Sequence, residues 1–338
     1  MTIVEPADGA AIARAAAILR EGGLVAFPTE TVYGLGADAT QAWAVARIYD
    51  AKDRPSFNPL IAHVADLDAA RREAALPEPA LRLAAAFWPG PLTIVAPLAP
   101  GGFVCDLARA GLPSVAVRVP AHPVAQALIA ALGRPIAAPS ANRSGHVSPV
   151  TAAHVAQDLS GKVDMILDGG RTAAGLESTI VSFCEGSPVL LRPGAVAREA
   201  IEKILGEKLS APERAEILAP GMTPSHYAPA ARLRLEAHEL KEGEAALDFL
   251  RLEAHELKEG EAALDFGGRL AARAEPGTVV LDLSPSGDLI EAAANLFAHL
   301  REFDARQIAD VAVAHIPERG LGEAINNRLR RASAPRLD

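Results

Sequence analysis

The sequence predicts an α/β protein of two domains, because helical and strand patterns alternate along the chain on both sides of a proline-rich segment. The chain has 338 residues, a length typical of two domains. Half of the residues are hydrophobic and 22% are charged, as in a globular protein that buries a full core. Aromatic residues make up only 4%, so we expect an aliphatic, alanine-rich core.

The first two hundred residues predict helices that alternate with short strands. Asp8 is placed to cap a first helix, which ends at Gly22 and Gly23. The later elements follow from apolar periods of 3.6 and 2. In chain order they are a strand at 24–27, a helix at 41–51, strands at 59–64, 92–98 and 114–119, a helix at 122–132, a strand at 136–138, a helix from the Thr151 cap to Gly161, strands at 163–167, 179–183 and 189–191, and a helix at 197–205.

A second α/β unit follows residues 211–231, which contain four prolines, show little periodicity and so predict a linker. We expect strands at 278–283 and 308–315 and helices at 288–303 and 322–332. Residues 233–249 are repeated without change at 250–266, which indicates a recent tandem duplication or an error of cloning or assembly. Either Leu233–Leu235 or Leu250–Leu252 fits one strand position, and the surplus copy is expected to be a dispensable surface insertion.

Composition excludes several classes of protein. A net charge of −9 argues against a surface that coats nucleic acid, although it allows a local basic pocket. Two cysteines, Cys105 and Cys184, supply neither a disulfide framework nor a four-cysteine zinc site. The first residues lack the pattern of a signal peptide, and prolines interrupt the apolar stretch at 87–104, so we expect a cytoplasmic protein without a membrane span.

Common nucleotide and nucleophile motifs are missing from the sequence, namely G-x-x-x-x-G-K-[ST], G-x-S-x-G and H-E-x-x-H. Residues 34–39 imitate a dinucleotide-binding glycine loop. However, residues 28–33 separate them from the preceding strand, whereas a dinucleotide loop follows its strand directly. We therefore do not expect a dinucleotide site there.

Polar residues instead gather where predicted strands end, at 28–36, 52–60, 139–145, 177–179 and 192–194. Such loops are where α/β sheets usually bind ligands. The set is cationic and rich in hydroxyl groups, which suits a phosphate or a small polar ligand. Its cations are Lys52, Arg54, Arg118, Arg143 and Arg192, and its hydroxyls are Thr31, Ser114, Ser140, Ser148 and Ser178.

Each of these residues also has a purely structural interpretation. Arg118 within an apolar strand is compatible with a salt bridge or a snorkelling side chain. His63 is compatible with a hydrogen-bonded core histidine. Lys52 and Arg54 fit a solvated helix end, and residues 139–142 fit a simple turn. Only the combination of these residues favours a binding site.

The combination resembles the YrdC/Sua5 family. The motifs PTETVYGLG, K-x-R-P with N-P-L, F-W-P-G-P-L-T, V-x-V-R-x-P, P-S-A-N-x-S-G, E-S-T-I-V and L-R-P-G occur here in the family's order. Segments 220–222, 226–229, 294–301, 320–325 and 327–329 resemble the Sua5-type linker and extension. The resemblance implies a twisted, open YrdC-like α/β domain with a basic cavity at 1–206, a linker covering the active site at 207–232, and a smaller Rossmann-like α/β Sua5 domain at 233–338.

The family's activity is that of threonylcarbamoyl-AMP synthase, which joins L-threonine, bicarbonate or CO2, and ATP, and releases pyrophosphate. The product serves the t6A37 modification of tRNA through a downstream tRNA threonylcarbamoyl transferase. By the resemblance, Lys52 and Arg54 are catalytic, and Mg2+ accompanies ATP. The positions that match the L-threonine site are Thr31, His63, Arg118, Ala138 and Ser178. The positions that match the ATP site are Lys52, Arg54, Asn58, Ser114, Ser140, Asn142, Ser148, Arg192 and Tyr227.

This chemistry suits the residue types. The N-carboxylate formed from threonine must attack the α-phosphorus of ATP, so two anions meet and the site needs fixed positive charge rather than a covalent nucleophile. An alternative is a double-stranded RNA-binding or regulatory module, since a basic cavity is compatible with weak RNA binding, but the net charge of −9 disfavours it. A carbamoyl-transfer domain of hydrogenase maturation is also disfavoured, because such proteins carry cysteine-rich zinc modules.

Overall fold

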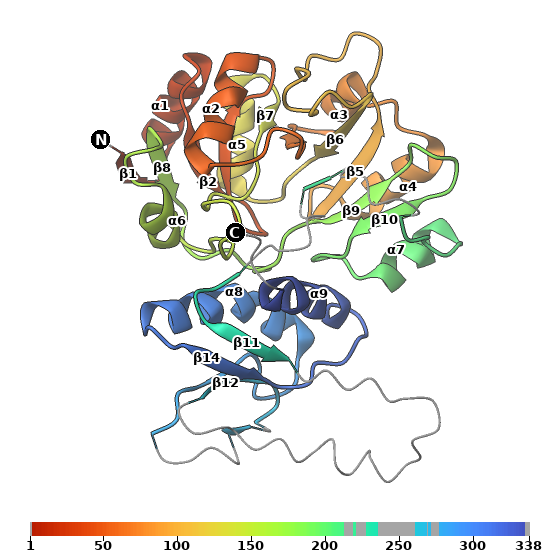
Figure 1. The fold of residues 1–338 in the computed structure, drawn as a ribbon. Coiled ribbons are helices and arrows are strands. Elements are labelled where there is room, and N and C mark those ends of the chain that lie inside the picture. The colour runs from red at the N-terminus through yellow and green to blue at the C-terminus, as the bar shows by residue number, and fades with distance from the viewer. Residues whose placement is uncertain are drawn as a thin grey trace.

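The computed structural model describes residues 2–212, 219–220, 228–235, 261–268, 270–271 and 277–334. It consists of a large lobe built from the first two hundred residues and a smaller lobe built from the C-terminal part of the chain (Figure 1). Each lobe contains its own sheet with helices packed on it, so the predicted α/β class with a larger and a smaller unit is confirmed. No helix in the described part of the chain is long and apolar enough to cross a membrane.

The large sheet has ten strands of mixed direction. Parallel pairs such as β4–β6 and β5–β9 alternate with antiparallel pairs such as β2–β3 and β5–β6. In spatial order the strands are β1 (Ile3–Pro6), β8 (Met165–Asp168), β2 (Val25–Pro28), β3 (Tyr33–Asp38), β7 (Ile136–Ala137), β4 (Ile61–His63), β6 (Ser114–Arg118), β5 (Leu92–Pro97), β9 (Thr179–Ser182) and β10 (Val189–Arg192).

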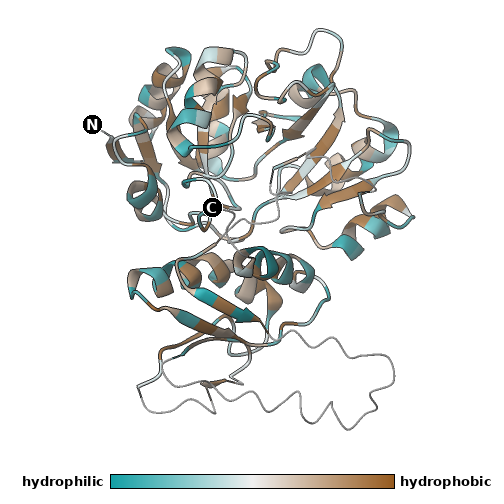
Figure 2. Cartoon of the chain, in the orientation of Figure 1, coloured by the Kyte–Doolittle hydropathy of each residue, from teal (hydrophilic) through white to brown (hydrophobic). Residues whose placement is uncertain are grey.

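Helices cover both faces of this sheet, and the alternation of each strand divides its side chains between two cores. Val25 and Phe27 pack with α1 (Gly9–Arg20) and α5 (Pro123–Leu132). Ala26 faces the other core, which is continuous with residues of the remaining helices. Those helices are α2 (Ala42–Lys52), α3 (Leu67–Glu73), α4 (Glu78–Phe87), α6 (Ala152–Leu159) and α7 (Arg198–Leu205). The strands are accordingly the most hydrophobic part of the ribbon (Figure 2).

Several predicted helix starts are confirmed by their caps. The Asp8 carboxylate accepts the N–H of Ala11 at 2.8 Å, and Thr151 caps α6 in the same way. The expectation that residues 28–36 form a loop is wrong in part, because Tyr33–Asp38 form β3. Pairing with β2, rather than local propensity, makes this segment a strand. Gly34 and Gly36 therefore lie within a strand, which excludes the dinucleotide loop.

The smaller sheet is entirely parallel, with the order β11 (Arg232–Leu235), β14 (Asp310–Val313), β12 (Ala262–Asp265) and β13 (Val280–Asp282). Helices α8 (Leu289–Ala305) and α9 (Gly322–Ser333) lie between this sheet and the large lobe (Figure 1). The two lobes share one hydrophobic core. Val32, Val147, Val150 and Leu176 of the large lobe belong to the same buried cluster as the inner faces of α8 and α9.

The duplicated segment supplies the smaller sheet from both of its copies. Leu233 and Leu235 of the first copy lie in β11, whereas β12 is the end of the second copy. Arg234 and Glu261, one from each copy, form a bidentate ion pair with N–O distances of 2.9 and 2.8 Å. The alternative strand segment Leu250–Leu252 lies outside the described residues. The first copy therefore fills the shared strand position, but neither copy supplies both strands.

Candidate active site

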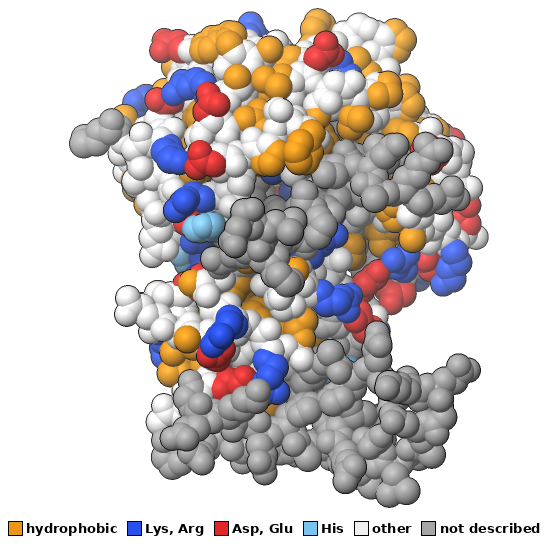
Figure 3. Space-filling view, in the orientation of Figure 1, with side chains coloured by type: hydrophobic (Ala, Val, Ile, Leu, Met, Phe, Trp, Pro, Cys, Tyr) orange, Lys and Arg blue, Asp and Glu red, His pale blue; other side chains and the backbone are white. Residues whose placement is uncertain are grey.

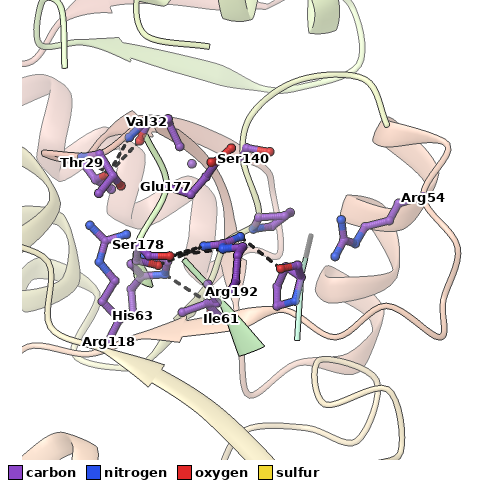
Figure 4. Close-up of a pocket in the computed structure, with 14 residues that line it drawn as sticks. Thr29, Val32, Arg54, Ile61, His63, Arg118, Ser140, Glu177, Ser178 and Arg192 are labelled. Carbon is purple, nitrogen blue, oxygen red and sulfur yellow. Dashed lines mark hydrogen bonds between the residues drawn. The ribbon is translucent and has the colours of Figure 1, made fainter. Parts of the chain in front are cut away.

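A cavity lies where strands of the large sheet end and loops from distant parts of the chain meet (Figure 4). Its wall includes the turn between β2 and β3, the segment after α2, the strand β4 and the end of β6. The segment after β7, the segment before β9 and the end of β10 also contribute. Pro220 of the linker also lines the cavity. The 14 lining residues are Thr29, Thr31, Val32, Gly34, Arg54, Ile61, His63, Arg118, Pro139, Ser140, Glu177, Ser178, Arg192 and Pro220.

One side of the cavity carries three of the residues predicted for L-threonine. The Thr31 hydroxyl lies 2.8 Å from that of Thr29, which in turn donates to the Val32 carbonyl. Burial and, after it, the nearby charge of Arg118 lower the pKa of His63 to about 3, so the imidazole is neutral at physiological pH. A neutral imidazole next to a fixed guanidinium suits recognition of an amino acid better than proton transfer near pH 7.

Arg118 is fixed from two directions. Its Nε donates to the Gly90 carbonyl at 3.2 Å, and its Nη2 donates to the Glu30 carboxylate at 2.6 Å. The second Glu30 oxygen accepts the N–H of Ala121. Burial would raise the pKa of Glu30, but the Arg118 charge and hydrogen bond outweigh it and lower that pKa. Glu30 therefore holds the guanidinium in place at the cavity wall.

Arg192 connects the strand end to the linker. Its Nη2 donates to the carbonyl of Ser178 at 2.8 Å and to the Ser178 hydroxyl at 3.2 Å. Its Nη1 donates to the Pro220 carbonyl at 3.1 Å. Figure 4 shows Arg192 and Ser178 between Arg118 on one side and Arg54 on the other. The sequence predictions of Ser178 and Arg192 thus fall on neighbouring groups of one cavity.

Arg54 is held by its own loop. The residue lines the cavity, and its guanidinium donates from Nε to the Asn58 carbonyl at 3.3 Å and from Nη2 to the Pro59 carbonyl at 3.1 Å. The predicted site residue Asn58 is buried and does not line the cavity, although its backbone fixes the arginine that does. The K-x-R-P and N-P-L motifs are therefore one structural unit.

Lys52 lies behind the wall instead of in it. This last residue of α2 is buried, and its Nζ donates to the carbonyl of Ser140 at 2.6 Å and to the carbonyl of Asn142. Burial lowers the pKa of Lys52 well below its usual range, and the charge of Arg54 adds to that effect. The Asn142 amide bonds the Arg143 and His146 carbonyls, so it also serves the loop. Neither Lys52 nor Asn142 lines the cavity.

Glu177 brings a carboxylate into the cationic wall. The Ser148 hydroxyl donates to its Oε1 at 2.5 Å, and Nε of Arg328, on α9, donates to its Oε2 at 2.9 Å. Burial would raise the pKa of Glu177, but the charges of Arg328 and Arg192 and the Ser148 hydrogen bond outweigh it and lower that pKa. Ser148, predicted for the nucleotide, therefore reaches the site through Glu177.

Three further predicted residues are not part of the described wall. Ser114 begins β6 and Ala138 donates its N–H to the Ile61 carbonyl at 2.9 Å, and neither lines the cavity. Tyr227 lies outside the described residues. Its neighbour Ala228 donates its N–H to the Gly145 carbonyl at 2.8 Å, so the linker end contacts the loop of the P-S-A-N motif.

Known proteins resemble this chain over nearly its whole length. Residues 17–194 match the family model described as telomere recombination, and residues 196–334 match that of the threonylcarbamoyl-AMP synthase C-terminal domain. The chain is 42% identical to the threonylcarbamoyl-AMP synthase of Bacillus subtilis, over 96% of this chain and 94% of the relative. It is 44% identical to that of Pyrococcus abyssi, with the same shares covered. The chain belongs to the Sua5 family of threonylcarbamoyl-AMP synthases.

The structural likeness covers the same extent. The crystal structure of P. abyssi Sua5 complexed with L-threonine superposes with a TM-score of 0.82 at 41% sequence identity, over 98% of this chain and 97% of that one. The Sua5-type extension is therefore present in fold as well as in sequence. Both lobes therefore belong to the family architecture.

Sequence reasoning missed the acidic members of this Sua5-family site. Glu30 and Glu177 lie within the PTETVYGLG and E-S-T-I-V motifs, but the predicted site consisted of cations and hydroxyls and gave these carboxylates no role. Arg328 lies within the recognised C-terminal signature, 151 positions from its partner Glu177, and no local pattern indicates that contact. A buried arginine requires a carboxylate partner, so the only available signal was charge balance within the motifs.

Proposed function

We propose that this protein is a threonylcarbamoyl-AMP synthase that joins L-threonine, bicarbonate or CO2, and ATP into threonylcarbamoyl-AMP and pyrophosphate. The observation that supports it most is the single cavity, which brings together Thr31, His63 and Arg118 from one set of motifs and Arg54 and Arg192 from another. Identity of 42–44% over 96% of the chain to proteins of that name supports the same activity.

The first step joins threonine to carbon dioxide. The free amine attacks the carbon of CO2, a C–N bond forms, and the amine loses a proton, which leaves an N-carboxylate. We assign Arg118 to the substrate carboxylate, because a guanidinium held by Glu30 and Gly90 is fixed before the ligand arrives. Thr31, His63 and Ser178 complete that side as polar contacts.

In the second step the N-carboxylate oxygen attacks the α-phosphorus of ATP. A new P–O bond forms, the bond to the bridging oxygen breaks, and pyrophosphate leaves with the electron pair. Arg54 and Arg192 stand in the wall where they can offset the charge of the two approaching anions. We assign Ser140 to the nucleotide side, and Lys52 and Asn142 to holding its loop.

Mg2+ is proposed to enter with ATP. Such ions usually bind substrate phosphates and keep several waters, and they need few protein ligands. The described residues contain no group of three acidic, histidine or cysteine side chains that could hold a metal, and the cavity carboxylate Glu177 is already bonded to Arg328 and Ser148. A phosphate-held ion fits this donor set, and it would supply charge neutralisation on the phosphates.

The decisive experiment incubates the purified protein with ATP, L-threonine and bicarbonate and measures pyrophosphate. We expect release that depends on threonine, and an adenylate product whose mass includes the carbamoyl group. Serine in place of threonine controls for the side-chain methyl group. Release that is the same without threonine would contradict the proposal.

The product's destination is proposed from the family to be the t6A modification of tRNA, with a separate transferase as the partner and the cytoplasm as the location. Direct RNA binding by this chain finds less support. On the face in Figure 3, Lys and Arg side chains are interspersed with Asp and Glu instead of forming one basic area. Duplex RNA that bound tightly at physiological salt would favour the alternative of a double-stranded RNA-binding module.

A further inference from the structure

The cavity contains a contact between the two lobes that no sequence motif assigns. Arg328 projects from α9 and has no exposed surface, and its Nε lies 2.9 Å from Oε2 of Glu177. Glu177 forms part of the cavity wall and is 5% exposed. One arginine of the C-terminal domain therefore contacts a residue that faces the proposed ATP site.

The need for this contact follows from charge. A site for two anions gains nothing from a carboxylate in its wall, and a buried carboxylate without a partner is costly. Among the described residues, the cations whose charges act on Glu177 are Arg328 from α9 and Arg192 from β10. Arg192 already donates hydrogen bonds to the carbonyls of Ser178 and Pro220, on the cavity side. Arg328 approaches from the other lobe, so it can neutralise Glu177 without withdrawing a cation from the ligand.

The other carboxylate oxygen of Glu177 links two segments of the site. Oε1 accepts the Ser148 hydroxyl at 2.5 Å, and Ser148 follows the loop that carries the P-S-A-N motif. Glu177 thus ties that loop to the segment before β9, and Ser178, the next residue, bonds Thr93 and Arg192. The orientation of this carboxylate affects both sides of the cavity.

We propose that Arg328 is a positioning residue for the nucleotide: it neutralises Glu177 and fixes its carboxylate, so that the cavity stays cationic and the Ser148 loop stays in place. This inference rests on the proposed function in taking ATP as the ligand. It gives the C-terminal domain a direct part in the site, through one side chain.

Replacing Arg328 by methionine removes the charge and keeps much of the volume. Burial then raises the pKa of Glu177, since the largest opposing charge is gone. Above that raised pKa the carboxylate is charged and repels the phosphates; below it the group is neutral and the repulsion disappears. We expect the ATP dissociation constant of Arg328→Met to rise about tenfold at high pH and to approach the wild-type value as the pH falls.

The test measures ATP affinity by calorimetry between pH 6 and 9, together with pyrophosphate release and melting temperature, for the full-length wild type, Arg328→Met and the double variant Arg328→Met/Glu177→Gln. Removing both charges should restore ATP affinity to within about threefold of the wild type at every pH. The control is Glu323→Gln, on the same helix, whose partner Arg198 lies across the lobe boundary at 2.6 Å but not in the cavity. It should leave ATP affinity unchanged.

Three results would overturn the inference: unchanged ATP affinity in a folded Arg328→Met variant, a loss that does not vary with pH, or a double variant that binds ATP as weakly as the single one. If Arg328→Met does not fold, the double variant decides the matter, because it leaves neither charge buried alone. A wild type that binds ATP but releases no pyrophosphate would refute the proposed function, while the affinities would still test this contact.

Discussion

Replacement of Lys52 by methionine tests whether this residue acts on the loop or on the nucleotide. The side chain is 1% exposed, and its Nζ bonds the carbonyls of Ser140 and Asn142 from behind the cavity wall. Methionine fills much of the same space but donates no hydrogen bond, so both carbonyls lose their charged partner. The structure predicts that Ser140 then shifts from its place in the cavity.

The size of the effect follows from these two bonds. Hydrogen bonds from a charged donor contribute about 1.5–3 kcal/mol each, so the gross loss is roughly 3–6 kcal/mol. Burial and the Arg54 charge oppose the charged form of Lys52 and lower its pKa. Methionine has no charge to bury, so the variant does not carry this desolvation and repulsion energy. We expect a net destabilisation of about 2–4 kcal/mol and, with the loop misplaced, a fall in kcat/KM of roughly a hundredfold.

The assay pairs urea unfolding with threonine-dependent pyrophosphate release. Lys162→Met is the matched control, because its ammonium group lies 3.1 Å from Asp53 but both side chains are exposed. That variant should lose less than about 1 kcal/mol and keep its activity. If Lys52→Met keeps its stability and loses only activity, the residue is a direct nucleotide ligand and the reasoning from the loop is refuted.

Three further predictions follow from other contacts. Deleting residues 236–252 leaves β11 and β12 joined by nine residues, which reach about 30 Å, so melting temperature and activity should stay near wild type. Arg118→Lys replaces the planar guanidinium fork by a single ammonium nitrogen and loses the bidentate geometry for a substrate carboxylate, so the KM for L-threonine should rise about tenfold while that for ATP stays constant. Asp158 has its pKa lowered to about 2, because its contacts with His146 at 3.7 Å and with Arg301 at 2.7 Å outweigh burial. Asp158→Asn should therefore cost roughly 2 kcal/mol at pH 7 in chemical unfolding, and the difference should vanish as the pH falls from about 4 to 2.

The deletion has a simple physical basis. Because the repeat is perfect, removing any 17 consecutive residues between 233 and 266 gives the same polypeptide. The connection must run from the end of β11 back to the start of β12. That path covers the length of one strand, about 13 Å, and two strand spacings that together are about 10 Å, which nine residues can span. The ion pair of Arg234 with Glu261 is kept. A large drop in melting temperature would show that the added residues serve the fold.

The sequence allowed most elements to be predicted wherever a local rule governs them. Asp8 and Thr151 each cap the helix expected of them, and the helix expected at 288–303 is present, with Asp288 as its cap. β1 and the helices α3 and α4 were not predicted, and β3 was expected to be a loop. Turn-rich residues at 28–36 hide the strand, because its stability comes from β2 on one side and β7 on the other. Local pattern carries no information on such pairing.

The predicted site residues fall into two groups, those that line the cavity and those that lie behind its wall. Motif order led to Thr31, His63, Arg118, Ser178 and Arg192, all of which line one cavity. The roles assigned to them remain predictions. Lys52, Asn142 and Ser148 show a different relation, since each is buried and bonded to a wall residue or loop. A sequence motif identifies such residues with the site but does not separate the residue that faces the ligand from the one that supports it.

The shared hydrophobic core explains why the C-terminal domain affects this site beyond one ion pair. Each large-lobe residue in that core is next or close in sequence to a polar residue of the site: Val32 follows Thr31, Leu176 precedes Glu177, and Val147 and Val150 flank Ser148 and Pro149. Because each of these apolar side chains is buried against the C-terminal domain, the backbone that carries its polar neighbour is held in place at or beside the cavity. Packing of α8 and α9 thereby positions two segments of the wall, at Thr31 and Glu177, and the Ser148 segment that is bonded to Glu177.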